Sequence, residues 1–445
     1  MYAVFIVVFS VALLSFLIMK CRVHAFFSLV ITAVVVGVLS GMPLADSISL
    51  MTEKLGSSIS SIAVVIGLAV VSGQLMDESG AAEKIARSIL KLTGNDKAPL
   101  AMVGTGYVLS IPLFSDTAYY LMIPIARALS LSSGGSFVAM IVAMGCGALA
   151  THCFVPPTPG PLAMAETLGI DLGLTMLVGM VVAAFAAIAG GWIWGQFISK
   201  RVEIPKERYA AGEADQGAQR ELPNLGVSLL PIVVPVVLVA GNTLTNAFLP
   251  GTAVAAFFGT FGQVVVALAI SVLVSYIILG LMRGRSRKDM FELTERAIAI
   301  GAVCILITGA GGAFGGVLVE CGIGSAITGL FHSTGISPII FAYILAVIFK
   351  TSQGSSATSM ITVSAMLAPL LPEMGLTFHP VYILTAIAAG SMTFSWMNDS
   401  GFWVITKLCN MTEKESLSTV SMGSLIMSVV GLIVTLIMSV ILPMA

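Results

Sequence analysis

Two aspartates lie inside apolar stretches of the chain, where a carboxylate is costly unless it has a task. Asp116 interrupts "LSIPLFSDTAYYLMIP" (109–124), and Asp399 lies in "WMNDSGFW" (396–403). A charge at the centre of a bilayer costs about 2.5–3.5 kcal/mol on insertion scales. We predict that Asp116, and after it Asp399, takes up and releases a proton. The alternatives are a buried ion pair of Asp116 with a cation such as Lys350, and a helix cap formed by Asp399.

Polar side chains gather at four interruptions of the apolar runs, at residues 113–118, 151–161, 352–358 and 396–403. Proline and glycine at these points leave backbone groups without helical partners, which protein, water or ligand must then supply. The amino ends of the half-helices would present N–H groups and a positive dipole to an anion. The residues predicted to bind a polyhydroxylated anion here are Ser115, Thr117, His152, Lys350, Gly354, Ser355, Ser356, Thr358 and Asn398.

Seven of these nine residues, all except Gly354 and Asn398, also have a structural explanation. Serine and threonine hydroxyls in membrane helices often bond to their own backbone. His152 could be a packed histidine or could itself carry a proton. Lys350 could attract a carboxylate or could extend its ammonium to a watery cavity.

The elements that must position these residues are membrane-spanning helices. The chain has 445 residues, of which 57% are hydrophobic and 10% charged, with a mean hydropathy of +1.03. A soluble protein would carry about 25% charged residues. Apolar runs of about 20 residues recur along the chain, and each can cross a bilayer as a helix. We therefore predict an all-α polytopic membrane protein whose first apolar run is retained, and the net charge of −1 argues against nucleic acid as a partner.

The distribution of basic residues predicts the topology. With the amino terminus outside, all 21 lysines and arginines except Lys54 and Lys350 fall on inner connections, as the positive-inside rule requires. This arrangement needs ten spanning helices plus two re-entrant hairpins, at 98–130 and 336–371. Both termini are then outside, and the loop at 200–224 is cytoplasmic.

An inverted repeat is predicted from two similar segments. "GLAVVSGQLMDESG" (67–80) and "GAGGAFGGVLVECG" (309–322) align without gaps, matching Gly67, Gly73, Glu78 and Gly80 with Gly309, Gly315, Glu320 and Gly322. The predicted topology runs them in opposite directions. The first repeat is then 1–199, with scaffold helices in 1–54 and a hairpin and broken-helix unit in 55–199. The second is 225–445, divided in the same way into 225–290 and 291–445. Paired interruptions in inverted repeats are typical of a transporter binding site near the midplane.

Several other functions lack their motifs. The chain has no P-loop, so ATP does not drive it, and "GAGGAFGG" lacks the spacing of a dinucleotide site. An enzyme built on His152 and Cys153 would need a third, orienting group, which we do not find. A channel does not need inverted interruptions with a buried carboxylate. We predict neither an enzyme nor a metal or cofactor site.

The interruptions also carry a family resemblance. "THCFVPPTPGP" (151–161), "QGSSATSMITVSAMLAPL" (353–370) and "NDSGFWVITK" (398–407), with the glycine-rich 309–322 segment, resemble the gluconate:proton symporter family of bacterial inner-membrane permeases. That family belongs to the ion-transporter superfamily, and the resemblance extends through nearly the whole chain. It implies proton-coupled import of a sugar acid such as gluconate. It also implies a homodimer in which a transport unit moves as an elevator against a scaffold.

The chain departs from that family at five positions, one of which is the additional hydroxyl of Ser356. Asp116 stands where glutamate is usual, and Lys350 replaces an arginine, which loses bidentate geometry toward a carboxylate. Thr158, counted here as a binding residue, stands where histidine is common, and Ser400 where proline is common. These changes keep the transport class and leave the solute open. The alternatives are a sodium-coupled carboxylate transporter and a permease for D-serine or a short hydroxy acid.

Overall fold

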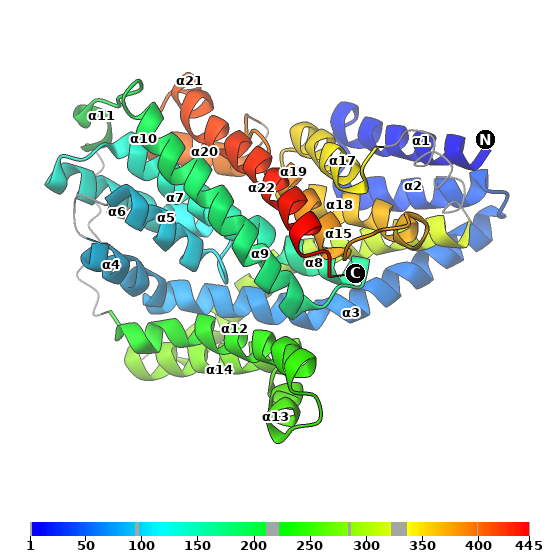
Figure 1. The fold of residues 1–445 in the computed structure, drawn as a ribbon, viewed down its shortest axis with the longest axis horizontal. Helices are drawn as coiled ribbons and strands as arrows, with labels where there is room; N and C mark the ends of the chain where they lie inside the picture. Colours follow the sequence, from blue (N-terminus) through cyan, green and yellow to red (C-terminus); the bar gives the residue numbers. More distant parts are fainter. Residues whose placement is uncertain are drawn as a thin grey trace.

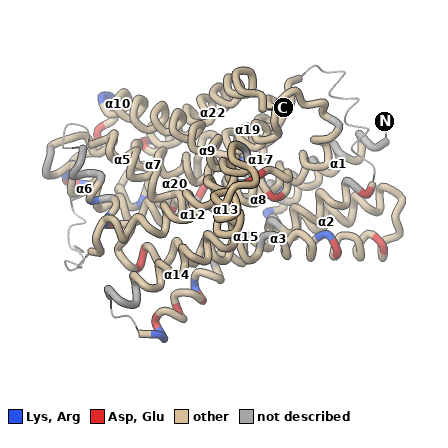
Figure 2. Tube along the Cα trace, turned by 60° about the horizontal axis from the view of Figure 1, so that its bottom comes forward, with Lys and Arg blue, Asp and Glu red and all other residues tan. Residues whose placement is uncertain are grey.

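The chain folds into helices joined by short turns. The computed structural model describes residues 2–93, 98–210, 222–283, 286–321, 336–397 and 399–444, and this part of the chain contains no strand. Five of its helices are long and apolar enough to cross a membrane, or seven if two bent pairs each count as one span. The predicted all-α membrane class is confirmed, whereas the number of ten spans stays a prediction. Figure 2 shows small groups of charged residues near helix ends, separated by long uncharged stretches.

Two long antiparallel helices form one side of the molecule. Helix α3 (Leu44–Ser79) and helix α15 (Arg287–Glu320) pack along each other, and α3 extends across most of the long axis (Figure 1). A methyl group on Gly312 of α15 would collide with Ser58 of α3, so the two backbones approach closely. Lys54, predicted as the one outer basic residue, pairs with Glu320 at 3.0 Å.

Helix α3 begins before its predicted start. The sequence predicts a span from residue 55, but the helix continues back to Leu44, with a 45° bend beyond Ser60. The ion pair of Lys54 with Glu320 joins this early part of α3 to the end of α15. The predicted domain boundary at 54/55 therefore falls inside α3, and that at 290/291 falls inside α15.

The remaining helices of this side flank the long pair. Helix α2 (Ala25–Leu39) packs on α15, whereas α14 (Val264–Arg283) packs on α3 and on α12 (Leu225–Phe248). A 67° bend separates α13 (Ala253–Phe261) from α14. Helix α1 (Tyr2–Ser15) ends in a π-helical turn, Phe16–Lys20.

Both predicted hairpins are pairs of helices around a short break. The first consists of α5 (Ala98–Leu109) and α6 (Ser115–Ser133), and the second of α17 (Pro338–Gln353) and α18 (Ser356–Leu367). A 3₁₀ segment, Ala368–Glu373, follows α18.

Both predicted broken helices are interrupted where proline, glycine and polar residues occur. The first consists of α7 (Phe137–Phe154) and α8 (Pro159–Leu168), and the second of α19 (Val381–Ser391) and α20 (Ser400–Leu408). Helix α6 packs on α20, and α18 packs on α8. Each hairpin therefore contacts the broken helix from the other half of the chain.

The other helices cover and connect these units. Helix α9 (Leu172–Ala187) packs beside α22 (Met422–Ile441), and a π-helical segment adjoins each, at Ile188–Ile193 and Leu417–Ser421. The short connecting helices are α4 (Ala81–Thr93), α10 (Trp194–Ile198), α11 (Lys206–Ala210) and α21 (Glu413–Ser416).

Candidate functional site

The tip of the first hairpin presents the amino end of a helix. Phe114 precedes α6 in an extended conformation and offers no capping side chain. The first intrahelical bond is donated by the amide of Ala118 to the carbonyl of Phe114, at 3.1 Å. The amides of residues 115–117 come before that bond and form the amino end of α6, the part of a helix where anions typically bind. Ser115, Asp116 and Thr117 thus form the first turn of α6.

The tip of the second hairpin is built around Gly354 and Ser355. Gly354 ends α17 with φ of 81°, a left-handed conformation that favours glycine. Ser355 caps α18, since its hydroxyl oxygen accepts hydrogen bonds from the amide of Thr358 at 3.2 Å and from its hydroxyl at 3.0 Å. The hydroxyls of Ser355 and Thr358, which we predict to bind the substrate, therefore also make hydrogen bonds that stabilise this tip.

A buried ion pair joins the second hairpin to the second broken helix. The ammonium of Lys350 lies 2.6 Å from Asp399 Oδ2 and donates to the carbonyl of Gly354 at 2.5 Å. The Lys350 side chain is 1% exposed and that of Asp399 is 14% exposed. The partner of Lys350 is thus Asp399, and not Asp116, which the sequence suggested as one possibility. Asp399 also caps α20, which was the alternative to a proton-carrying role, because its Oδ1 accepts from the amide of Gly401 at 2.9 Å.

The two aspartates face the same turn of helix. A methyl group on Gly401 would lie 3.3 Å from Asp116 Oδ1 and 3.4 Å from Asp399 Oδ1. The first turn of α20 therefore lies between a carboxylate from the first hairpin and one from its own cap. Lys350 compensates the charge of Asp399 directly.

A cavity of about 630 Å³ opens between the hairpin tips and the broken helices. Eight of the predicted residues line it: Ser115, Asp116, Thr117, His152, Gly354, Ser355, Ser356 and Asp399. Four further polar residues line the cavity and were not predicted from the sequence: Gln74, Tyr119, Ser395 and Ser424. Tyr119 follows Asp116 by one helical turn, so helical spacing could have found it. Gln74 lies inside the repeated segment 67–80, but nothing in its sequence context indicates that it faces the hairpins.

Comparison with known proteins identifies the family. The sequence profile described as GntP family permease matches residues 2–441. The chain belongs to the GntP permease family. It is 33% identical to a gluconate permease of Zymomonas mobilis over 96% of this chain and 95% of the relative. It is 32% identical to the high-affinity gluconate transporter of Escherichia coli, over 96% and 97%.

A further relative and two solved structures extend the comparison. An L-idonate transporter of Escherichia coli is 29% identical over 96% of this chain and 97% of its own length. The YdaH transporter of Alcanivorax borkumensis has a TM-score of 0.64 at 13% identity, over 90% of each chain. The MtrF efflux pump of Neisseria gonorrhoeae has a TM-score of 0.63 at 13% identity, over 88% and 84%. The two structures share the fold. As a GntP family permease, the chain is a multi-pass membrane transport protein and not an enzyme.

Three predicted binding residues of this GntP family permease lie outside the cavity lining. The Thr158 hydroxyl lies 3.0 Å from the carbonyl of His152 and 2.7 Å from that of Val155, which stabilises the break between α7 and α8. Thr358 bonds to Ser355, and Lys350 is buried behind the wall. The remaining predicted residue, Asn398, lies outside the described residues.

Two of the lining residues are held by the surrounding helices of the permease. His152 is 7% exposed, its ring lies 6.0 Å from that of Phe114, and its Nδ1 has no hydrogen-bond partner in the described part of the chain. The Tyr119 hydroxyl donates to the carbonyl of Gly145 at 3.4 Å. The tip of the first hairpin and the end of α7 thus contact each other at the cavity wall.

Proposed function

We propose that this GntP family permease is a secondary active importer that carries a small hydroxylated carboxylate, a sugar acid such as gluconate, together with a proton. The observation that carries the proposal is the 630 Å³ cavity between hairpin tips and broken helices, with two carboxylates facing Gly401. The names of the relatives, which include gluconate and L-idonate transporters, support the substrate class.

The substrate is bound by hydroxyls and helix amino ends. The amides at the start of α6 and α18 hold the substrate carboxylate, because the helix dipole favours an anion there. Ser115, Thr117, Ser356 and His152 bond the substrate hydroxyls. Three other predicted residues stabilise the structure around the substrate. Thr158 stabilises the break between α7 and α8, and Thr358 and Lys350 stabilise the tip of the second hairpin.

Asp116 couples the proton to the anion. Lys350, 2.6 Å from Asp399, compensates a negative charge on that carboxylate. An ionised Asp116 would repel an anionic substrate in the same cavity, and protonation removes that repulsion. The proton and the anion therefore bind together, and Asp399 is the second candidate for the proton.

The matched glycines of the two halves support inverted repeats and an elevator movement. A methyl group on Gly73 of α3 would lie 2.5 Å from the carbonyl of Pro112, at the first hairpin. A methyl group on Gly315 of α15 would lie 2.7 Å from the carbonyl of Ala365, on the second hairpin. The hairpins thus pack closely on equivalent points of α3 and α15. The scaffold predicted at 1–54 and 225–290 is extended here to the ends of the continuous helices α3 and α15. On this proposal α1–α3 and α12–α15 form the scaffold of a homodimer in the bacterial inner membrane, with both termini periplasmic.

Transport by purified protein in liposomes tests the proposal. An inward pH gradient should drive accumulation of labelled D-gluconate, and a sodium gradient at equal pH on both sides should not. Excess unlabelled L-idonate should compete, whereas the uncharged amide of gluconic acid should compete at least tenfold less well. Accumulation driven by the sodium gradient and not by the pH gradient would show that sodium, and not a proton, is the coupling ion. Absence of gluconate uptake under both gradients would refute the substrate class.

A further inference from the structure

Two polar residues of the cavity wall, as far as the structure describes it, come from neither the hairpins nor the broken helices: Gln74 of α3 and Ser424 of α22, whose hydroxyl already accepts from the amide of Ser395. Among the described residues that line the cavity, Gln74 belongs to α3 and Val303 to α15, the two long antiparallel helices. Gln74 is half-buried, and its amide carries both a hydrogen-bond donor and an acceptor. Such a group matches a substrate hydroxyl, which also donates and accepts.

Three consecutive residues of α3 contact three different parts of the molecule. Ser72 is held by the helices α12 and α14, because its hydroxyl lies 2.7 Å from that of Ser271. Gly73 lies against the first hairpin, at the carbonyl of Pro112. Gln74 faces the cavity. Successive residues of an α-helix project about 100° apart, which accounts for the three directions.

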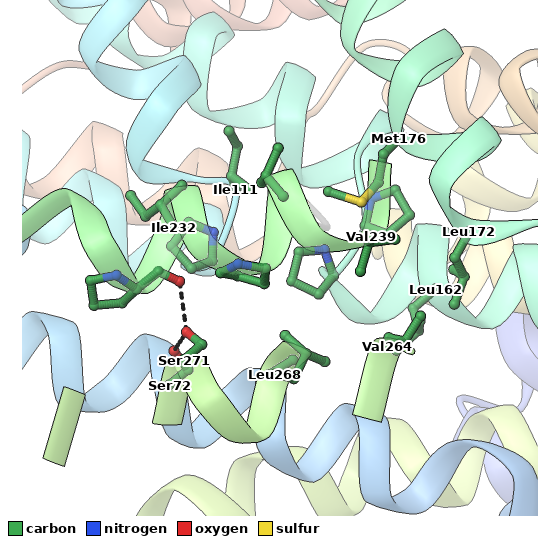
Figure 3. Close-up of a pocket in the computed structure, with 17 residues that line it drawn as sticks. Ser72, Ile111, Leu162, Leu172, Met176, Ile232, Val239, Val264, Leu268 and Ser271 are labelled. Atoms are coloured by element: carbon green, nitrogen blue, oxygen red, sulfur yellow. Dashed lines mark hydrogen bonds between the residues drawn. The ribbon is translucent and has the colours of Figure 1, made fainter. Parts of the chain in front are cut away.

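The contact at Ser72 belongs to a series of hydrogen bonds that joins α3 to α14 and α12. Pro235 has no amide hydrogen, so the carbonyl of Pro231 lacks its usual donor within α12. The hydroxyl of Ser271 donates to that carbonyl at 2.6 Å, and the Ser72 hydroxyl donates in turn to Ser271. Figure 3 shows Ser72 and Ser271 meeting between α3 and α14, with dashed lines along this chain. The surrounding pocket is apolar, so few other groups could satisfy the carbonyl.

We infer that Gln74 binds the substrate from the stationary side of the transporter and so contributes to affinity in only one orientation of the site. The inference rests on the proposed function, because it takes α3 as part of a scaffold past which the hairpins move. When the hairpins and broken helices travel with the substrate, Gln74 stays with α12 and α14. A group that contacts the ligand in one state alone shifts the population toward that state and gives the two faces unequal affinities.

The test measures the KM for D-gluconate from each face of the membrane. Gln74→Ala and the volume-matched Gln74→Met are compared with wild type in right-side-out and inverted vesicles. Loss of one uncharged hydrogen bond should raise the KM about fivefold at one face. The KM at the other face should change less than twofold. Ser115→Ala is the matched control, because Ser115 lies on the moving hairpin and its loss should raise the KM at both faces.

Each outcome decides the inference. A KM that rises equally at both faces, or at neither, in both Gln74 variants overturns it. Should Gln74→Ala fail to accumulate in the membrane, Gln74→Met decides, because it keeps the packing volume and removes only the amide. If wild-type vesicles take up no gluconate in either orientation, the proposed function fails first. Normal wild-type uptake with unchanged Gln74 variants refutes the present inference alone.

Discussion

The ion pair between Lys350 and Asp399 allows a quantitative test of what holds the site together. Replacing Lys350 with methionine leaves Asp399 as a largely buried carboxylate whose other oxygen keeps the Gly401 amide. Removing one partner of a buried pair costs about 3–5 kcal/mol. Because the Asp399 side chain is 14% exposed and that of Lys350 only 1%, we expect about 3 kcal/mol for Lys350→Met. Asp399→Asn, which strands the more deeply buried ammonium, should cost about 4–5 kcal/mol.

The double variant provides the critical comparison. Lys350→Met with Asp399→Asn removes both charges, and replacing a buried pair by uncharged groups is often nearly neutral. We expect the double variant to lie within about 2 kcal/mol of wild type and to be more stable than either single variant. The assay is unfolding of the purified protein in one detergent. Additive losses would show that the two charges do not stabilise each other.

The same variants separate a structural lysine from a substrate-binding one. If Lys350 bound the substrate carboxylate, Lys350→Met would lose affinity for gluconate while keeping its stability. From the structure we expect the opposite, namely that the main effect of Lys350→Met is a loss of stability. Lys350→Arg keeps the charge and should retain most transport.

Three further predictions concern coupling, close packing and pH. Asp116→Asn should abolish accumulation driven by a pH gradient but keep counterflow exchange, and proton-dependent accumulation by this variant would move the carrier elsewhere. Gly73→Ala should slow transport severely, because its methyl group would meet the Pro112 carbonyl; Gly67→Ala, with open space around it, is the matched control in the same uptake assay. The Arg208 guanidinium lowers the pKa of Glu415, so the stability that the pair contributes is complete above the ordinary carboxyl pKa of about 4.3 and is lost as pH falls through the lower folded-state pKa. The difference in melting temperature between wild type and Glu415→Gln should therefore be constant near neutral pH and shrink below about pH 4; a difference that grows on acidification would contradict the assignment.

The interruptions of the helices could be predicted because their causes are local. Gly354 ends α17 and Asp399 caps α20 through bonds to residues within four positions. Proline, glycine and clustered hydroxyls have these effects in any context, so the two tips and both breaks were identified from the sequence. Eight predicted residues meet at one cavity because both hairpins and both broken helices converge there.

The missed features depend on contacts between distant segments. Lys350 and Asp399 are 49 positions apart, and the sequence gives no register for the helices that bring them together. Gln74 faces the cavity only because α3 passes the first hairpin at Gly73. Glu320 approaches Lys54 only because α3 and α15 pack as an antiparallel pair. Local propensity carries no information about any of these three contacts.

The charges at the site explain why proton and anion would move together on the proposed mechanism. Lys350 and Asp399 cancel, so the net charge of the moving site is set by Asp116 and by the substrate. An empty site with ionised Asp116 carries one negative charge, and so does a loaded site with protonated Asp116. A loaded site with ionised Asp116 would carry two like charges in one cavity, which is the state that repulsion and desolvation penalise most. Because these two forms have equal charge, the electrostatic cost of moving the site past the scaffold is the same for the empty site and the loaded site. The Gly401 turn, which faces both carboxylates, is then the place where the form of Asp116 is sensed by the broken helix.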